Sequence, residues 1–376
     1  MNYSQAARAA DRARVVELDA QIHELQEQIR VLQLERDPCK LRLDSYRYPV
    51  LTLPNEIVSE IFVQFLPPYP DCPPLWGLDS PTTLTHICCK WREIALADPM
   101  LWRSLSINSY VDDGDKQLQV VQAWLERSGS CPLSIDLESS HEYYEAPPKG
   151  YLIATFLHRE RWQHGRLDLR AKEVALIEGP MPLLESLSLA VDHLRYTHPA
   201  TMVGDLPRLR SVTLDDAHHG NWLPLSQLTA LTLKDMHDTN YFILLQDAVN
   251  LVHLYLIQCT RLNSPPNNIT LTRIETLVML DCLGGQTLDL FTLPALRGLQ
   301  WSGELEDEDP ICTLTSLVSR SGCKLQQVLL TGTCDVSEES LQVAFPSIPK
   351  VTFETEYDWY SEGRTGFKNG LGLEPT

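Results

Sequence analysis

Two short clusters have the residue types of a metal or acid–base site. His86 is followed closely by Cys88 and Cys89, and His218-His219 follow Asp215-Asp216. Imidazole, thiolate and carboxylate groups are the usual ligands of zinc. On a single helix, however, the first three side chains would point to different faces, and the second cluster is typical of a polar turn after a strand. We therefore expect no metal site at either place.

Compact catalytic motifs are missing from the sequence. It contains no G-x-x-x-x-G-K-[ST], G-x-S-x-G or H-E-x-x-H, and no G-x-G-x-x-G that opens a helix after a strand. The sequence therefore lacks the motifs on which phosphate, acyl-transfer, zinc and dinucleotide chemistry usually depends. We expect no enzyme, no catalytic residue and no cofactor. The alternative is an enzyme hidden in a repeat region, dependent on His218 or Cys259.

Composition describes a folded protein of two or three structural units. The 376 residues are 43% hydrophobic and 22% charged, as in globular chains. No apolar run approaches the roughly 18 residues of a membrane span, and the first residues lack the apolar stretch of a secretory signal. Ten cysteines are scattered without C-x-x-C, which suits a reducing compartment. We expect cytoplasm and/or nucleus, and no membrane partner.

The charge is strongly negative and uneven. Residues 1–50 hold eight basic and eight acidic residues, so the whole excess of the net charge of −19 lies in residues 51–376. A region with this excess of negative charge repels phosphate backbones at long range, and the sequence has no stripe of basic residues to offset that repulsion. Nucleic acid is therefore not an expected partner.

The N-terminal segment 1–37 has the regular spacing of a coiled-coil helix. Its apolar positions alternate in steps of three and four, with β-branched residues at heptad position a and leucine at d: Val15, Leu18, Ile22, Leu25, Ile29 and Leu32. This pattern favours parallel dimers. Self-association through residues 15–32 is one interpretation, and packing on the same chain is the other. Pro38 is expected to end the helix, and residues 38–48 to form a linker.

Residues 49–107 predict short helices with unusually wide apolar faces. On a helix following Pro54, apolar residues fill an arc of about 180°, against nearer 100° for an ordinary surface helix: Ile57, Val58, Ile61, Phe62, Phe65 and Leu66. A proline-rich loop, 67–81, separates it from a second helix, expected from Pro81, on which Leu84, Ile87, Cys88, Trp91, Ile94 and Ala95 share one face. So short a segment cannot cover both faces itself, so a second surface must contribute.

The spacing in residues 51–107 resembles the F-box. The pattern comprises Leu53-Pro54-x-x-Ile57, Ile61-Phe62, Leu84-x-x-Ile87-Cys88-x-x-Trp91-Arg92-x-x-Ala95 and Pro99-x-Leu101-Trp102. The inserted loop 67–81 makes it similar to the F-box-like family of mushroom-forming fungi. The resemblance implies docking on the Skp-type adaptor of an SCF (Skp–cullin–F-box) ubiquitin ligase, and through it a cullin. The implied adaptor contacts are Leu53, Pro54, Ile57, Ile61, Leu84, Ile87, Cys88, Trp91 and Trp102; the alternative assigns them to the chain's own core.

Residues 108–356 repeat a Leu-x-x-Leu-x-Leu pattern. Eight copies are centred on Leu187, Val212, Leu231, Leu254, Leu277, Leu299, Val328 and Val351, and successive centres lie 19 to 29 residues apart. This is the period of leucine-rich repeats, each a strand with a return segment. Weaker units occur at Leu105/Ile107, Leu133/Ile135/Leu137 and Leu167/Leu169. Two copies end on Cys259 and Cys282, at the repeat's Asn/Cys position, which predicts packing inside.

The predicted fold is therefore α/β: an N-terminal coiled-coil-like helix (1–37), a linker (38–48), a small all-α F-box (49–107), a curved leucine-rich-repeat solenoid with a parallel sheet (108–356) and a flexible tail (357–376). Side chains between the repeat leucines should face the open side of the sheet, where solenoids usually bind ligands. Most of them are small and polar. The exception is an apolar patch, expected to contact a target protein, of His253, Tyr255, Ile257, Val278 and Leu280.

Two functional hypotheses follow. The first is a substrate-recognition subunit of an SCF-type ubiquitin ligase, which positions a target protein of unknown identity near a separate enzyme. The second is an interaction scaffold outside the ligase that uses the same adaptor contact. For the apolar patch, the competing interpretation is that the C-terminal tail, with Tyr357, Trp359 and Tyr360, folds over it.

Overall fold

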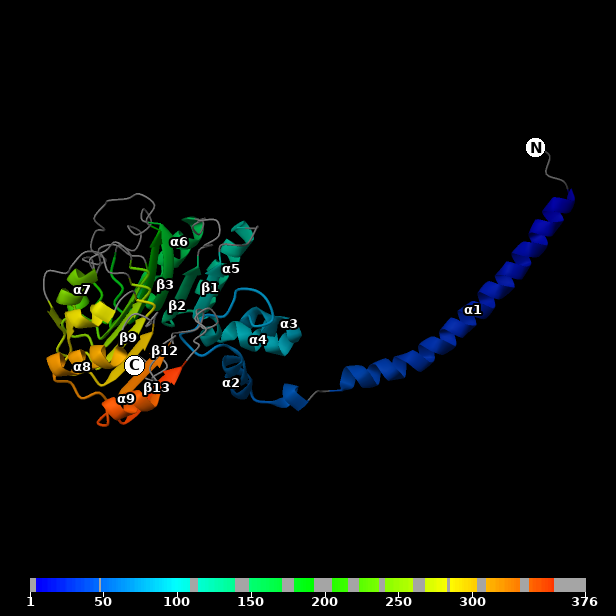
Figure 1. Ribbon diagram of the computed structural model, residues 1–376. Helices are drawn as coiled ribbons and strands as arrows, with labels where there is room; N and C mark the ends of the chain where they lie inside the picture. Colours follow the sequence, from blue (N-terminus) through cyan, green and yellow to red (C-terminus); the bar gives the residue numbers. More distant parts are fainter. Residues whose placement is uncertain are drawn as a thin grey trace. The chain divides into compact units, whose positions relative to one another are not determined.

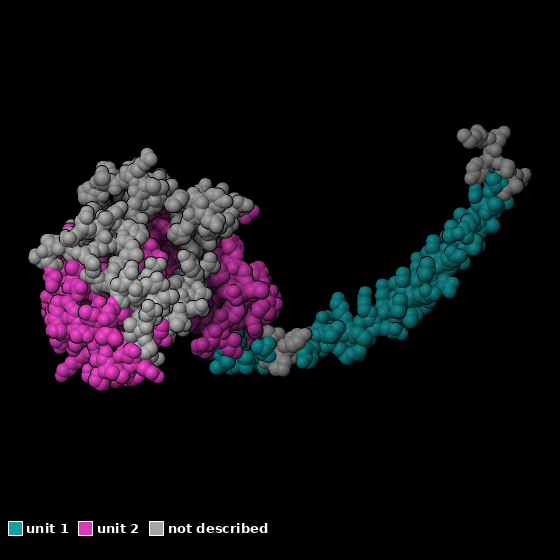
Figure 2. Space-filling model, in the orientation of Figure 1, with its two compact units in different colours: residues 1–58 teal, residues 59–376 magenta. Residues whose placement is uncertain are grey.

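The computed structural model describes most of the chain and divides into two compact units, residues 1–58 and 59–376 (Figure 2). The boundary between the units falls inside helix α2 (Asn55–Phe65). Each unit is described by itself. The described residues are 5–46, 49–108, 114–138, 149–170, 179–192, 205–215, 223–236, 241–259, 268–282, 285–302, 309–331 and 338–354.

The first unit is dominated by one long helix. Helix α1 (Gln5–Ser45) has 41 residues and is followed by the 3-10 helix η1 (Pro49–Thr52) (Figure 1). The prediction that Pro38 ends the helix was wrong, because α1 contains Pro38 and continues for seven more residues. A proline removes one backbone donor and usually breaks or kinks a helix. Here it leaves the helix continuous, so much of the predicted linker is helical.

Short helices follow between residues 55 and 102: α2 (Asn55–Phe65), η2 (Pro81–Thr83), α3 (Leu84–Ile87), α4 (Cys89–Ala97) and η3 (Pro99–Trp102). The predicted single helix from Pro81 is wrong, because Cys88 has extended backbone angles of φ −157° and ψ 168°. Its thiol accepts a bond from the Trp91 amide and so caps α4. The Asp98 side chain caps η3, with Pro99 in the first turn.

The described part of the second unit contains a parallel sheet of eleven strands. Their order follows the chain: β1 (Ser104–Asn108), β2 (Leu133–Glu138), β3 (Trp162–Arg170), β4 (Ser186–Asp192), β5 (Ser211–Asp215), β6 (Ala230–Lys234), β7 (His253–Ile257), β9 (Thr276–Leu280), β11 (Gly298–Ser302), β12 (Gln327–Thr331) and β13 (Lys350–Glu354). Each predicted Leu-x-x-Leu-x-Leu unit, weak ones included, contributes one of these strands. The mixed α/β class with a large parallel sheet is therefore confirmed.

Helices and short irregular segments return the chain from one strand to the next. The helical ones are α5 (Gly114–Arg127), α6 (Lys149–Phe156), η4 (Arg159–Arg161), η6 (Leu225–Gln227), α7 (Tyr241–Asp247), η7 (Gly285–Leu290), α8 (Pro310–Ser321) and α9 (Glu338–Ala344). The two-residue strands β8 (Ile269–Thr270) and β10 (Phe291–Thr292) pair in parallel.

The core lies between one face of the sheet and these return segments. Repeat leucines and their equivalents on that face are buried, from Leu105 to Val351. Aromatic side chains pack between these elements: Trp124 of α5 meets Trp102 of η3 edge to face at 5.2 Å, and Phe156 of α6 meets Trp162 of β3 at 5.0 Å. Within the described chain, no helix combines the length and apolar content needed to cross a bilayer.

Candidate functional site

Helix α2 divides its wide apolar arc into a covered and an uncovered half. Val58 and Phe62 are each 1% exposed, whereas Ile57 and Ile61 are 50% and 46% exposed, and Phe65 is comparable. The three uncovered side chains follow one another at intervals of four residues, so they form a stripe along one side of the helix. The arc predicted from the sequence is real, but only half of it remains open.

The covered half of α2 is fixed to α4. The rings of Phe62 and Trp91 meet edge to face, with centroids 5.0 Å apart. The Ser59 hydroxyl donates to the Asp98 carboxylate at 2.8 Å, and the same carboxylate receives the Met100 amide at 3.0 Å. An Asp98 side chain that caps η3 thus also holds α2 against the end of α4. This leaves Ile61 and Phe65 on a side of α2 that the described residues do not bury.

Several expected adaptor contacts are accessible. Ile87, the last residue of α3, is exposed, and Trp91 and Cys88 are half-buried. In the first unit, Leu53 is half-buried and Pro54 is exposed. Leu53, Pro54 and Ile57 remain expected adaptor contacts of the first unit. The candidate adaptor surface of the second unit is defined as Ile61, Phe65, Ile87, Cys88 and Trp91.

Two expected contacts belong to the interior. Leu84 is buried, and Trp102 is completely enclosed, with its indole N–H donating to the Ala95 carbonyl at 2.8 Å. The Arg127 guanidinium lies 4.7 Å from the centre of the Trp102 ring. Neither side chain has surface to offer a partner, so the prediction of an adaptor contact is corrected for both. For these two positions the core interpretation was right.

Other exposed apolar side chains were not among the expected adaptor contacts. Phe65 was predicted on the apolar arc, and it continues the spacing of Ile57 and Ile61 by one more turn. Trp76, Leu78 and Met100 are also exposed. Trp76 and Leu78 belong to the proline-rich loop, where no helical period exists to assign a face, so sequence spacing carried no signal for them.

The proline-rich loop is attached to the first strands of the sheet. Tyr69 donates its phenol hydrogen to Gln163 of β3 at 3.0 Å, and the Arg103 guanidinium lies 3.9 Å from the centre of its ring. Burial raises the pKa of Tyr69 to about 12. Ser134 of β2 donates to the Pro70 carbonyl at 2.6 Å. The loop therefore links the helices on either side of it to β2 and β3.

A second set of contacts secures the middle of this loop. The Cys72 sulfur lies 3.4 Å from the Ser134 hydroxyl, and burial raises the pKa of the Cys72 thiol to about 12. The Ser106 amide of β1 donates to the Pro73 carbonyl at 3.3 Å. A thiol with so high a pKa is not a nucleophile at neutral pH. The role of Cys72 here is structural.

The expected target patch is mostly closed. Tyr255, Val278 and Leu280 are buried and form an apolar cluster with Leu329, against which Ile257 packs. The prediction that these residues point to open solvent was wrong, because alternation along a strand gives the face of a side chain but not what covers that face. His253 is half-buried, and burial lowers its pKa. The tail with Tyr357, Trp359 and Tyr360 lies outside the described residues.

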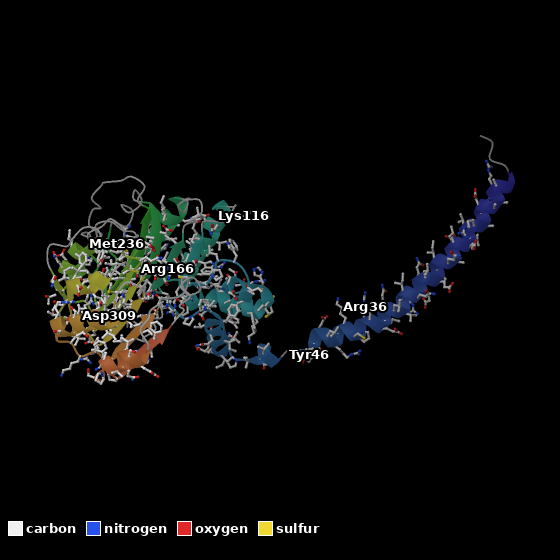
Figure 3. The ribbon with its side chains drawn as sticks, viewed as in Figure 1. Arg36, Tyr46, Lys116, Arg166, Met236 and Asp309 are labelled. Carbon is white, nitrogen blue, oxygen red and sulfur yellow. The ribbon has the colours of Figure 1, made fainter. Side chains whose placement is uncertain are left out.

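The same face changes character along the sheet. In one row of paired residues, side chains from β3 to β6 are polar and at least partly exposed: Arg166, Ser188, Thr213 and Thr232. Arg166, labelled in Figure 3, lies 3.7 Å from the Asp136 carboxylate of β2. The row continues into Tyr255 and Val278, which are buried. The open part of this face is therefore polar, and we call it the polar strand face.

Three turns after successive strands repeat one conformation. Asp235, Gln258 and Asp281, which follow β6, β7 and β9, have φ values of 48°, 51° and 50°. Non-glycine residues adopt this left-handed region at a cost. The amides of Asp235 and Gln258 each donate to a carbonyl at the end of the next strand, at 3.0 and 2.7 Å. The repeated turn then directs the following side chain back into the core.

That inward position holds the two cysteines predicted to pack inside. Cys259 and Cys282 are buried, as expected, and each thiol donates to a carbonyl of the preceding strand, Leu233 or Leu256, at 3.4 Å. The hydrogen bond with the Cys259 thiol, together with burial, raises the pKa of Cys282. The arrangement satisfies strand carbonyls inside the core, which is a packing function.

Of the two chemical clusters considered first, the one around His86 does not assemble in the described residues. Because the chain breaks at Cys88, His86 and Cys89 lie on different helices, and no group of three His, Cys, Asp or Glu side chains in the described ranges is arranged to hold a metal. His218-His219 lie outside the described residues.

No protein-family model matches this chain. No curated protein sequence matches it either. The functional assignment therefore depends on the surfaces described above and on the F-box resemblance.

Proposed function

We propose that the chain is the substrate-recognition subunit of an SCF-type ubiquitin ligase, without an active site of its own. Its helical segment would dock a Skp-type adaptor, through it a cullin, and its repeats would form a leucine-rich-repeat solenoid that holds a target protein. This function requires the cytoplasm and/or nucleus, where that ligase operates. The observation that carries the proposal is the uncovered stripe of α2, in which Ile57 and Ile61 stand at positions that the F-box resemblance assigns to the adaptor.

Exposure of these side chains supports the proposal because apolar surface is costly to leave in water. Burying apolar surface contributes roughly 25 cal/mol per Å². Ile61 and Phe65 are nevertheless held open by the Phe62–Trp91 contact and the Ser59–Asp98 hydrogen bond. A helix fixed in this way presents a preformed surface, and preformed surfaces lose little conformational entropy on binding.

The polar strand face is the part of the sheet that we assign to the target. Arg166, Ser188, Thr213 and Thr232 are accessible and present hydrogen-bonding groups on adjacent strands. The buried patch around Tyr255 is not part of this assignment. A polar, partly charged surface favours a target recognised by hydrogen bonds rather than by a large apolar contact.

Binding of the full chain to a purified Skp-type adaptor tests the proposal. We expect a saturable complex, and Ile61→Ser should weaken it by about 5- to 150-fold, the loss of 1–3 kcal/mol typical of a buried anchor. The matched control is Ile153→Ser on α6, where the isoleucine is 55% exposed; it should bind as the unchanged chain does. Absence of a complex, or equal effects of both substitutions, would reject the adaptor contact.

An interaction scaffold outside the ligase remains the second candidate, and the same α2 stripe supports it. Adding a purified cullin separates the two. A ternary complex of chain, adaptor and cullin supports the ligase subunit. A chain–adaptor complex that excludes cullin supports the scaffold.

A further inference from the structure

Helix α1 carries an apolar stripe that the described residues of the first unit leave uncovered. The six residues Val15, Leu18, Ile22, Leu25, Ile29 and Leu32 are 40% to 63% exposed. They repeat with the heptad spacing, β-branched at a and leucine at d.

The continuation of α1 past Pro38 adds positions that the sequence did not assign to a helix. In the heptad register set by Val15 as a, Arg36 is an a residue, Cys39 a d residue and Leu43 the next a residue. Pro38 itself occupies position c, away from the a/d stripe. A cysteine thus stands on the same stripe as the six apolar residues, one heptad beyond Leu32. Its thiol is free and exposed.

The flanking charges match a parallel pair of identical helices. In a parallel two-stranded coiled coil, each g residue faces the e residue five positions later on the other helix. Here that places Arg14 opposite Asp19, and Glu35 opposite Lys40. The two remaining pairs, Gln21 with Gln26 and Gln28 with Gln33, are neutral. No like-charged pair occurs among the four, and both charged pairs attract.

The cations and anions concerned are available for such contacts. Arg14 currently bonds Glu17 of its own helix at 2.7 Å, but both side chains are more than half exposed, so this ion pair is weak and exchangeable. Arg36, labelled in Figure 3, pairs with Asp37 at 2.7 Å on the surface. As a charged residue at an a position, it lowers stability but penalises registers that would place it against apolar residues.

We propose that two copies of this chain associate through α1 as a parallel, in-register, two-stranded coiled coil. In this arrangement Cys39 of one copy faces Cys39 of the second copy across the d layer. An antiparallel pair centred on the same stripe would instead place Cys39 opposite residue 8, and would separate the two thiols by about 45 Å. The position of one thiol therefore reports both partner and orientation.

Disulfide trapping of the full chain tests the arrangement. With oxidised glutathione, two Cys39 thiols form one disulfide and release two molecules of reduced glutathione. We expect a covalent dimer in denaturing electrophoresis without reductant, lost in Cys39→Ser and retained in Cys312→Ser. Cys312, on α8, is equally free and exposed, so its substitution controls for random cross-linking.

Sedimentation equilibrium under reducing conditions provides an independent readout. We expect a concentration-dependent dimer that Leu25→Asp abolishes. Val31→Asp is the matched control, because Val31 is exposed at position c on the same helix, and it should leave the dimer intact. A monomer at all concentrations, a dimer without the Cys39 cross-link, or a dimer insensitive to Leu25→Asp would each overturn the proposal. None of these results depends on adaptor binding.

Discussion

The rings of Phe62 and Trp91 pack edge to face, with their planes at 66° and their centroids 5.0 Å apart. This contact joins α2 to α4 and separates the interior of the helical segment from its open stripe. Residues three positions apart on α2 therefore have opposite roles. Phe62 belongs to the core and Phe65 to the surface.

Alanine substitution of Phe62 and of Phe65 should lower the free energy of unfolding by different amounts. Phe62→Ala is expected to lower the free energy of unfolding by about 3–5 kcal/mol, because it leaves a cavity. Phe65→Ala should cost about 0.5 kcal/mol or less, as at most exposed positions. Urea unfolding followed by tryptophan fluorescence measures both. Similar losses for the two variants would mean that the open stripe is covered in solution.

The proline-rich loop should make stability depend on alkaline pH. The pKa of Tyr69 rises from 10.0 to about 12 in the folded chain, chiefly through burial. The unfolded state therefore loses this proton first, so the contribution of Tyr69 to stability is complete below pH 10 and disappears as the pH rises to 12. Cys72, whose pKa is raised from 9.0 to about 12, acts with the same sign.

The measurement is the urea midpoint as a function of pH. Tyr69→Phe should reduce the fall in the midpoint between pH 10 and 12. An unaltered slope in Tyr69→Phe would contradict the attachment of the loop through the Tyr69 phenol.

Arg161 should be intolerant of replacement by lysine. Its Nη2 donates to the Ser128 hydroxyl at 2.7 Å and to the Cys131 carbonyl at 2.9 Å, which Nε also reaches at 3.1 Å. A planar fork makes these bonds together, and an ammonium cannot reproduce it. Arg161→Lys is expected to destabilise the chain by about 1–3 kcal/mol. The measurement is the thermal unfolding midpoint of Arg161→Lys, compared with that of Arg208→Lys at an exposed arginine. Equal midpoints for the two variants would refute the role of the planar Arg161 guanidinium.

Thiol reactivity should follow burial. Iodoacetamide is expected to modify Cys89 and Cys312 rapidly in the native chain, because both are exposed, and to leave Cys259 and Cys282 unmodified. Mass spectrometry of the peptides over time measures the order. In denaturing urea the four should react at similar rates. Early modification of Cys282 in the native chain would show that the turn after β9 opens readily.

The strands were predictable because their signal is local. Each Leu-x-x-Leu-x-Leu unit fixes which side chains enter the core, and a parallel neighbour needs the same spacing in the next unit. The break at Cys88 was not predictable in this way, since it depends on one thiol capping the Trp91 amide. Continuation of α1 through Pro38 also contradicts the local rule for proline.

Whether a helix or strand face is buried depends on tertiary packing, and the spacing of apolar residues in the sequence does not reveal it. The same apolar signal marked Phe62 and Ile61, although only Ile61 is open. Tyr255 and Val278 were predicted to be open on alternation alone, yet both are buried. Trp102 fitted the adaptor pattern, but its hydrogen bond to Ala95 and its contact with Trp124 place it in the core. Periodicity identifies candidate surfaces, and packing decides between them.

The strand order of the sheet has a consequence for how the protein is made. Because every described strand of that sheet pairs only with its neighbours in the strand sequence, a strand leaving the ribosome finds its partner already synthesised. The sheet can therefore grow one strand at a time from β1, without waiting for the C-terminal part of the chain. A ribosome halted midway would carry an ordered nascent chain whose last strand presents an unpaired edge, which is the part that chaperones would need to shield.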